Sequence, residues 1–284
     1  MNIIKRVPLI LIVLIVLIAI LLTGCSPRES ASEVAKKYSD RVNSGDYETA
    51  YDLLSKDTKK KVSLERFKEY QSVLLETKKV IGYKLIKEEN IEKYKYDKKE
   101  YKNLVKLEET YDIKNIYLKK CESLKINRYL IVENNQYKLL WHENFKRNLS
   151  SRYLDVVYLK FRKHEIVSDK TLKKALKDTT LLLKKAVDID PTNSDAYYAQ
   201  TCHYMNLDEY DNGLISINNC LKYLDKKNSN YKKDLSDAYN LKAVMCMGNK
   251  KYDEAKKFLN KSLYANKDNN DAKFNLKVIK NQLE

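Results

Sequence analysis

Apolar positions first recur every three or four residues along the chain, which is the period of an amphipathic helix. Five of them fall on one face of a predicted helix, namely Ala31, Val34, Ala35, Tyr38 and Val42. The break at Asn43-Ser44-Gly45-Asp46 predicts the end of this helix and the start of a second one. Gly45 suits a left-handed C-terminal position, and Asp46 can cap the next helix, over 47–54. Ser63 is a plausible cap for a third helix.

The period changes to two after residue 79, which predicts strands over 80–86, 101–111, 124–132 and 137–142. Glu133-Asn134-Asn135-Gln136 predicts a hairpin turn, because asparagine tolerates positive φ. Helices followed by a bent antiparallel sheet predict an α+β domain over residues 31–146.

Residues 150–284 carry helical patterns that repeat. Asp195-Ala196-Tyr197, Asp237-Ala238-Tyr239 and Asp271-Ala272-Lys273 each open a predicted helix. The spacing from Ala238 to Ala272 is 34 residues and that from Ala196 to Ala238 is 42, with the longer interval assigned to a polar loop over 225–231. We therefore expect an all-α array of about three helix pairs. A final helix over 271–283 carries Phe274, Leu276 and Ile279.

The N-terminus has a different pattern. Lys5 and Arg6 precede an apolar run over 8–22, which is short for a membrane span of about 20 residues and suits a signal peptide. Leu22-Thr23-Gly24-Cys25 follows and resembles the lipobox of bacterial lipoproteins.

The lipobox resemblance implies cleavage between Gly24 and Cys25, so that residues 1–24 are removed and Cys25 carries diacylglyceryl lipid. Residues 25–30 then form a tether to membrane lipid on the extracytoplasmic face of the cell membrane. An uncleaved membrane anchor is the alternative.

Charge and composition limit the classes of partner that this chain can bind. The net charge is +16 over 284 residues, with 55 basic residues spread among 39 acidic ones. No compact basic stripe with interleaved aromatic residues is present, which argues against nucleic acid as a partner. A modest attraction to anionic headgroups or wall polymers is physically reasonable. Heavy use of Lys, Asn, Ile and Tyr is typical of low-GC Gram-positive bacteria.

The sequence offers no catalytic constellation, cofactor motif or metal-binding pattern. The spacing of Cys121, Cys202, Cys220 and Cys246 contains no CxxC pair and fits no zinc motif, and we expect packing to explain these cysteines. His142 is interpreted as a surface or hydrogen-bonded histidine, and Trp141 as a core anchor. We therefore expect no enzymatic activity.

The first domain resembles the nuclear transport factor 2-like fold. The motifs are 34–38 (VAKKY), 45–55 (GDYETAYDLLS) and 63–67 (SLERF), with 135–141 (NQYKLLW) as the last strand. The likeness is closest to the N-terminal domain of class B penicillin-binding proteins. That domain is non-catalytic, and no transpeptidase domain follows here, so no such chemistry is implied.

The second domain resembles tetratricopeptide repeats. One repeat has residues of the expected type at Tyr197, Tyr204, Gly213, Ile217 and Cys220. The next repeat has them at Tyr239, Ala243, Ala255, Leu259 and Ser262. Gln200 and Thr201 stand where Leu-Gly is usual, and Lys267 where proline is usual.

This second resemblance implies a concave face, lined by the first helix of each pair, that binds an unidentified protein or peptide partner. The candidate groove residues are Tyr198, Cys202, Met205, Asn206, Asn240, Leu241, Val244 and Met247. The expected function is a non-enzymatic binding or scaffold module at the membrane. The alternatives are a face that only packs, small-ligand binding or an unrecognised hydrolytic activity in the cone of the first domain, and an accessory role in cell-wall synthesis.

Overall fold

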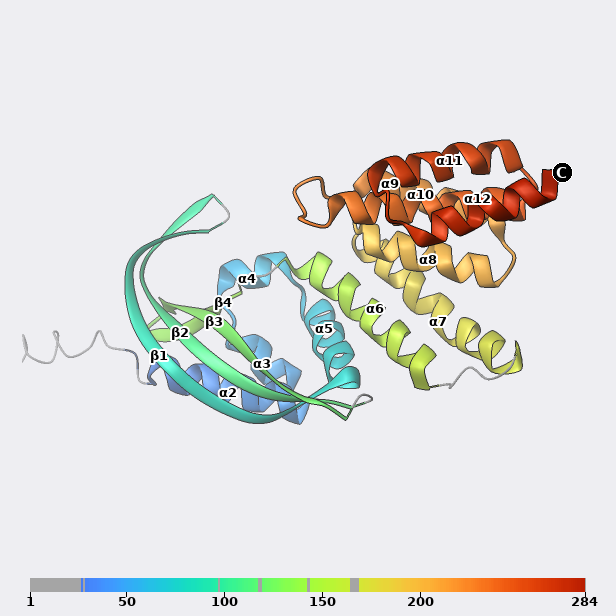
Figure 1. Cartoon of the computed structure of the whole chain (residues 1–284). Coiled ribbons are helices and arrows are strands. Elements are labelled where there is room, and N and C mark those ends of the chain that lie inside the picture. The colour runs from blue at the N-terminus through green and yellow to red at the C-terminus, as the bar shows by residue number, and fades with distance from the viewer. Residues whose placement is uncertain are drawn as a thin grey trace, which may run out of the picture. The chain divides into compact units, whose positions relative to one another are not determined.

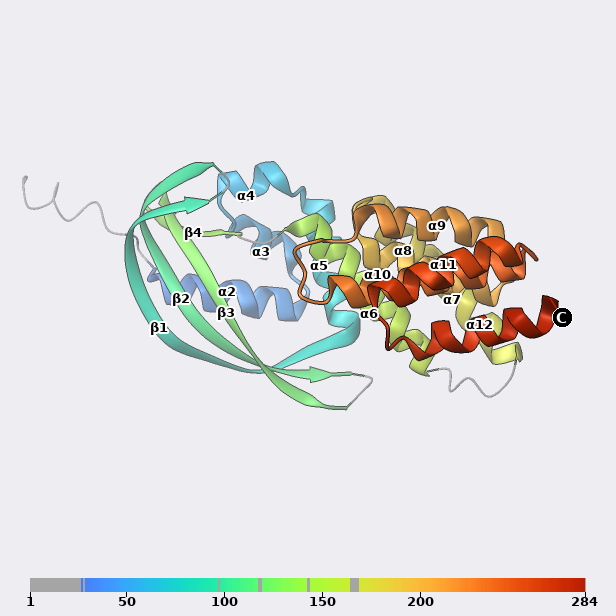
Figure 2. The same cartoon turned by 45° about the horizontal axis from the view of Figure 1, so that its top comes forward.

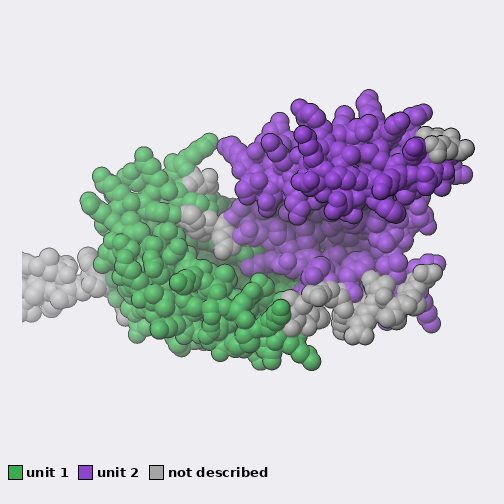
Figure 3. All heavy atoms as spheres, viewed as in Figure 1, with its two compact units in different colours: residues 1–142 green, residues 143–284 purple. Residues whose placement is uncertain are grey.

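The computed structural model describes residues 27, 29–96, 98–116, 119–141, 144–163 and 169–283. The chain divides into two compact units, residues 1–142 and residues 143–284 (Figure 3). Gly24, Cys25 and the apolar run before them lie outside the described residues, as does His142. Among the residues described, no helix is both long and apolar enough to cross a membrane.

Side-chain caps start the helices of unit 1. The Ser30 hydroxyl accepts from the Glu33 amide at 3.3 Å, and the Glu33 carboxylate accepts from the Ser30 amide at 2.7 Å. Gly45, with a φ of 80°, ends this helix, and Asp46 caps the next one, as predicted. The four described helices of this unit are α2 (Ala31–Ser44), α3 (Tyr47–Asp52), α4 (Lys56–Lys61) and α5 (Leu64–Thr77).

Helix α4 was not expected, because its sequence KDTKKK has no apolar stripe. The hydroxyl of Ser55 accepts from the amide of Thr58 at 3.2 Å and thereby caps the helix. Thr58 is 2 % exposed, and its hydroxyl accepts a hydrogen bond from the Trp141 amide at 2.9 Å. This short helix therefore depends on a cap and one buried hydroxyl.

A four-stranded antiparallel sheet follows, in the order β1-β2-β3-β4. Asn134 and Asn135 have φ values of 50° and 60°, so the predicted turn between the last two strands is confirmed. The strands are β1 (Lys78–Tyr96), β2 (Lys99–Asn115), β3 (Cys121–Glu133) and β4 (Gln136–Leu140).

Strand β1 is much longer than the predicted 80–86. Its charged second half pairs with β2 through residue 96, although few of these side chains are covered. Register shifts at Val80/Gly82 and Leu85/Lys87 mark bulges, which bend a strand. The sheet curves around α2 to α5 in both views (Figures 1 and 2).

Aromatic side chains fill the space between the helices and the sheet. The Trp141 ring meets Phe67 edge-on at 5.7 Å and Tyr70 at 4.8 Å between ring centroids. Phe67, Leu104, Leu107 and Leu130 are completely buried. Trp141 is half-buried and packs against the buried rings of Phe67 and Tyr70, so the predicted anchor lies at the edge of the core.

The described residues of unit 2 form helices joined by short connections, with no strand among them. Contacts join α6 to α7, α8 to α9 and α10 to α11, and α12 packs on α10 and α11. We call α6, α8, α10 and α12 the leading helices, and each contacts the next one along. The bounds are α6 (Phe145–Lys163), α7 (Asp169–Ile189), α8 (Ser194–Asn206), α9 (Tyr210–Tyr223), α10 (Tyr231–Gly248), α11 (Tyr252–Ala265) and α12 (Asn270–Leu283).

Small residues allow these helices to approach closely. A Cβ atom on Gly213 would lie 2.4 Å from the sulfur of Met245, so α9 approaches α10 closely at this glycine and a larger residue would displace the Met245 side chain. Cys220, Ala243, Ala255 and Ser262 are likewise buried. The predicted polar loop over 225–231 is confirmed to within one residue, because α9 ends at Tyr223 and α10 begins at Tyr231. The helix predicted to open at Asp237 therefore begins six residues earlier.

Two helix pairs are each joined to the next helix by a buried asparagine: Asn193 joins α6–α7 to α8, and Asn269 joins α10–α11 to α12. Asn269, before α12, donates to the Ser236 hydroxyl of α10 at 2.9 Å and accepts from the Ala272 amide at 3.0 Å. Ser236 in turn donates to the Ser262 carbonyl of α11. Asn193, before α8, donates to Ser150 of α6 at 2.8 Å, and Ser150 donates to the Ala186 carbonyl of α7. We call each of these arrangements a clasp.

His203 of α8 carries a buried polar atom with no partner. Its side chain is 4 % exposed, and its Nε2 lies 3.0 Å from the Thr180 hydroxyl of α7. That hydroxyl gives its single proton to the Leu176 carbonyl, so Nε2 must carry the hydrogen of the imidazole. Nδ1 is then an acceptor, and no described group bonds to it.

Protonation of His203 should destabilise unit 2. Burial lowers the pKa of His203 despite an opposing effect of Glu209, so the unfolded state binds a proton more readily than the folded state. Stability is therefore lost as the pH falls below the unfolded value of about 6.5, by at most about 1.4 kcal/mol per pH unit.

Hydrogen exchange in α7 and α8 between pH 7 and pH 5.5, corrected for intrinsic rates, measures this effect. We expect acid to lower protection in the natural chain more than in His203→Gln, whose amide can still donate to Thr180. Equal loss of protection in both proteins would contradict the prediction that protonation of His203 destabilises unit 2.

Candidate functional site

The interior of unit 1 holds the most concentrated set of charged and polar side chains. Arg128 of β3 donates from Nε to the Glu109 carboxylate of β2 at 2.5 Å. The hydroxyls of Tyr83 and Tyr111 donate to the same carboxylate, each at 3.1 Å. Glu109 is 1 % exposed and the Arg128 side chain 18 %, so the carboxylate is buried and its cation reaches water at one edge.

Helix α2 completes this network. The Ser39 and Tyr111 hydroxyls lie 2.8 Å apart, and the Arg128 guanidinium lies over the Tyr38 ring at 4.9 Å. Burial raises the pKa of Tyr83, and the neighbouring Glu109 carboxylate raises it further, so this hydroxyl stays protonated and donating. The polar groups of the interior bond to one another, which leaves little for a ligand to satisfy.

The leading helices present a different surface. Asp195, Asp237 and Asp271 each stand one residue before a fully buried alanine, namely Ala196, Ala238 and Ala272. Tyr198, Asn240 and Phe274 stand two residues after those alanines. We call these two sets of equivalent positions, on α8, α10 and α12, the leading-helix face.

Asn240 of this face is bonded to a neighbouring leading helix. Asn275 of α12 donates to the Asn240 side-chain oxygen of α10 at 2.9 Å. Burial raises the pKa of Tyr198, with contributions from Asp237 and Asp271 on the next two helices. Burial also raises the pKa of Asp237, where Asp271 adds to the effect and Lys233 opposes it.

Two side chains of this face are available for contacts with a partner. Phe274 is 65 % exposed. The Tyr198 hydroxyl is half-buried and has no hydrogen-bond partner among the described residues. An exposed ring and an unsatisfied hydroxyl beside carboxylates are features of a surface that can bind a partner.

The structure separates the candidate groove residues. Tyr198, Cys202, Met205 and Val244 are half-buried in one cluster, and Met247 packs in the next one. Asn206 is exposed, and Asn240 is half-buried and bonded to Asn275. Leu241 is 6 % exposed and belongs to the core, so it offers almost no surface. Sequence reasoning missed Phe274 as a surface residue, although the repeat register aligns it with Tyr198.

The cysteines are all unpaired in the described structure. Cys220 and Cys246 are buried and Cys202 is half-buried, as expected from packing. The same expectation is wrong for Cys121, which is exposed at the start of β3. Within the described residues, no three His, Cys, Asp or Glu side chains are placed to hold a metal ion.

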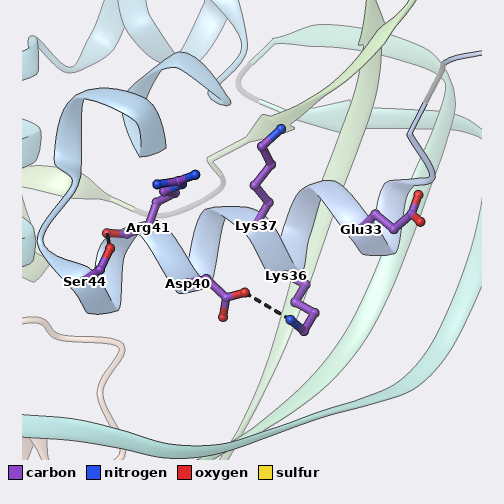
Figure 4. A pocket seen from close by; sticks show the side chains of 6 residues that line it. All are labelled: Glu33, Lys36, Lys37, Asp40, Arg41 and Ser44. Carbon is purple, nitrogen blue, oxygen red and sulfur yellow. Dashed lines mark hydrogen bonds and ion pairs between the residues drawn. The ribbon is translucent and has the colours of Figure 1, made fainter.

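A hollow of about 490 Å³ lies along α2 (Figure 4). Its lining mixes charges of both signs, and its cations are paired: Lys36 with Asp40, and Lys37 with Glu29, each at 3.1 Å. Arg41 pairs with Asp46 at the same distance. These neutralised pairs make the hollow a weaker candidate than the leading-helix face.

Removing one partner of the Glu109–Arg128 pair should destabilise unit 1. Arg128→Met leaves a buried carboxylate without its cation, which costs about 3–5 kcal/mol. Glu109→Gln/Arg128→Met should recover much of that loss, because the neutral amide oxygen still accepts from the tyrosines.

Urea unfolding followed by Trp141 fluorescence reports on unit 1, since the chain has one tryptophan. Lys125→Met on the same strand is the exposed control and should change stability little. A double variant no more stable than Arg128→Met would argue against the ion pair.

No protein-family model matches this chain, and no curated protein matches it in sequence.

Proposed function

We propose that this chain is a lipid-anchored, extracytoplasmic lipoprotein that binds another protein through the leading-helix face and has no enzymatic activity. In this proposal unit 1 has a nuclear transport factor 2-like fold, unit 2 is a tetratricopeptide array, and Cys25 carries the lipid. The observation that carries the proposal is the leading-helix face. It places equivalent side chains on three consecutive leading helices, among them an exposed phenylalanine and a tyrosine hydroxyl without a partner in the described part of the chain.

Several features support the two fold assignments. Helices followed by a strongly bent antiparallel sheet are compatible with the first, and paired helices with buried small residues are compatible with the second. In tetratricopeptide arrays the concave binding face is lined by the first helix of each pair, which corresponds to the leading-helix face here. The proposed set of binding residues leaves out Leu241, because it is buried, and includes Phe274, because it is exposed.

The anchor supports the same function. Two acyl chains hold a protein on a membrane far longer than one chain does. A partner on the same membrane then meets the face at a raised effective concentration, so that a modest interface suffices.

Phe274→Ser should abolish recovery of the partner, because it removes the exposed ring of the face without opening a core cavity. Affinity purification of the full-length protein from detergent-solubilised membranes, with mass spectrometry, measures this loss. Tyr264→Ser on α11 is the matched control, since Tyr264 is 92 % exposed and lies outside the face. A partner recovered equally with both variants would exclude this face as the binding surface.

The intact mass of the same preparation checks the anchor. We expect residues 25–284 with lipid on Cys25. Retention of residues 1–24 with an unmodified Cys25 would contradict the anchor while leaving the binding surface untouched.

A further inference from the structure

The net positive charge of unit 1 is concentrated in two short segments. Residues 27–142 contain 26 basic and 20 acidic residues. Helix α4 and the end of the β1–β2 hairpin, residues 56–61 and 93–102, hold nine of the bases, all lysines, and three of the acids. The rest of this range is balanced, with 17 basic and 17 acidic residues. These two segments therefore account for the net charge of residues 27–142.

Side-chain contacts hold the two segments together. The Lys61 ammonium group lies over the Tyr96 ring, 4.7 Å from its centroid. Lys99 forms a salt bridge with Asp57, and the Tyr101 hydroxyl donates to the same carboxylate at 3.1 Å. The sequence shows no compact basic stripe here because the segments are far apart along the chain and meet only in the fold.

Tyrosines of the hairpin end pack against unit 1 and leave the neighbouring lysines outside. The Tyr94 ring stacks on Tyr129 of β3 at 4.6 Å between centroids, and Tyr101 is 7 % exposed. Side chains alternate between the two faces of a strand, so Lys93 and Lys95, on either side of Tyr94, lie on the outer face and are exposed.

Five exposed lysines of these segments form what we call the basic patch. None of them has a side-chain partner among the described residues, and they are Lys56, Lys93, Lys95, Lys98 and Lys102. Lys93 stands directly opposite Lys102 in the strand ladder, an arrangement in which like charges repel. Glu100, opposite Lys95, offsets one of these charges.

Other acids beside α4 are engaged in contacts of their own. Asp52 pairs with Lys59 at 3.3 Å, and the Glu133 carboxylate accepts from the backbone amide of Lys56 at 3.1 Å. The basic patch therefore keeps an excess of positive charge, held on a hairpin end that is already packed in place.

We propose that the basic patch binds the anionic phospholipid headgroups of the membrane to which the chain is anchored. This inference rests on the lipid anchor of the proposed function. The tether over residues 25–30 spans at most about 20 Å, so unit 1 can turn at the membrane surface but cannot leave it. Because the rest of residues 27–142 is balanced in charge, the patch is the part of unit 1 that an anionic bilayer attracts most.

The range of this attraction favours exposed lysines. Screening confines it to about 8 Å from the headgroups at physiological ionic strength. A long lysine stem lets the ammonium group reach the headgroups while the strand stays outside the bilayer. Soluble phosphate polymers carry the same charge as the headgroups, and the test separates the two.

The test uses the full-length protein in vesicles of phosphatidylcholine, with or without about one-third phosphatidylglycerol. A short pulse of amine acetylation, read by mass spectrometry, measures the accessibility of each lysine. In the anionic vesicles the patch lysines should be labelled about threefold more slowly, and about 1 M salt should abolish the difference.

A variant with four patch lysines removed tests the patch itself. Protection of the remaining patch lysine, Lys56, should be lost in Lys93→Gln/Lys95→Gln/Lys98→Gln/Lys102→Gln. The substitutions also remove the repulsion between positions 93 and 102, so they do not weaken the hairpin.

A matched control removes the same charge from exposed positions of unit 2. It is Lys250→Gln/Lys256→Gln/Lys257→Gln/Lys267→Gln. Lys250 has a φ of 60° and Lys98 one of 64°, so both variants place glutamine at one left-handed position. Protection of Lys56 should be unchanged in this control.

Three results would overturn the inference. The patch lysines could be labelled equally in both kinds of vesicle, Lys56 could stay protected in the patch variant, or its protection could be lost in the control. Protection by soluble polyglycerol phosphate but not by phosphatidylglycerol would also overturn it, and would assign the patch to a wall polymer. An intact mass without lipid on Cys25, with the patch lysines still protected, would contradict the anchor and leave headgroup binding intact.

Discussion

The clasp of Asn269 is the interaction on which the leading-helix face depends. One side chain caps α12 through Ala272 and holds Ser236 of α10, which itself bonds to the end of α11. Each bond contributes about 1 kcal/mol, but leaving a buried polar group unsatisfied costs more. The clasp therefore fixes where α12 starts relative to α10, and it leaves Asn275 of α12 2.9 Å from the Asn240 side-chain oxygen of α10. Asn193 does the same for α8 on α6 and α7.

The two units place their polar groups in opposite ways. In unit 1 the Glu109 carboxylate is enclosed and accepts from Arg128, Tyr83 and Tyr111, so the charges satisfy one another. Such a network is costly to break, and its groups are already bonded to one another. In unit 2 the first-turn carboxylates of α8 and α12, Asp195 and Asp271, are exposed, and that of α10, Asp237, is half-buried. This contrast is why binding is assigned to unit 2.

Local signals in the sequence predicted much of the fold. Gly45, Asp46 and the Asn134-Asn135 turn act within a few residues, and each has the predicted conformation. Features that depend on distant residues were missed. Helix α4 needs the contact between Thr58 and Trp141, and the second half of β1 is held mainly by its pairing with β2. Glu109 and Arg128 could not be paired without the strand register, and the burial of Leu241 depends on helix rotation, which a repeat pattern fixes only approximately.

Site-specific photocrosslinking in intact cells tests the binding surface most directly. A photoreactive phenylalanine analogue at position 274 probes the leading-helix face, and one at position 264 probes an equally accessible surface of α11. We predict a discrete protein adduct from position 274 and none from position 264. Adducts from position 264 alone, or equal adducts from both positions, would contradict binding through the leading-helix face.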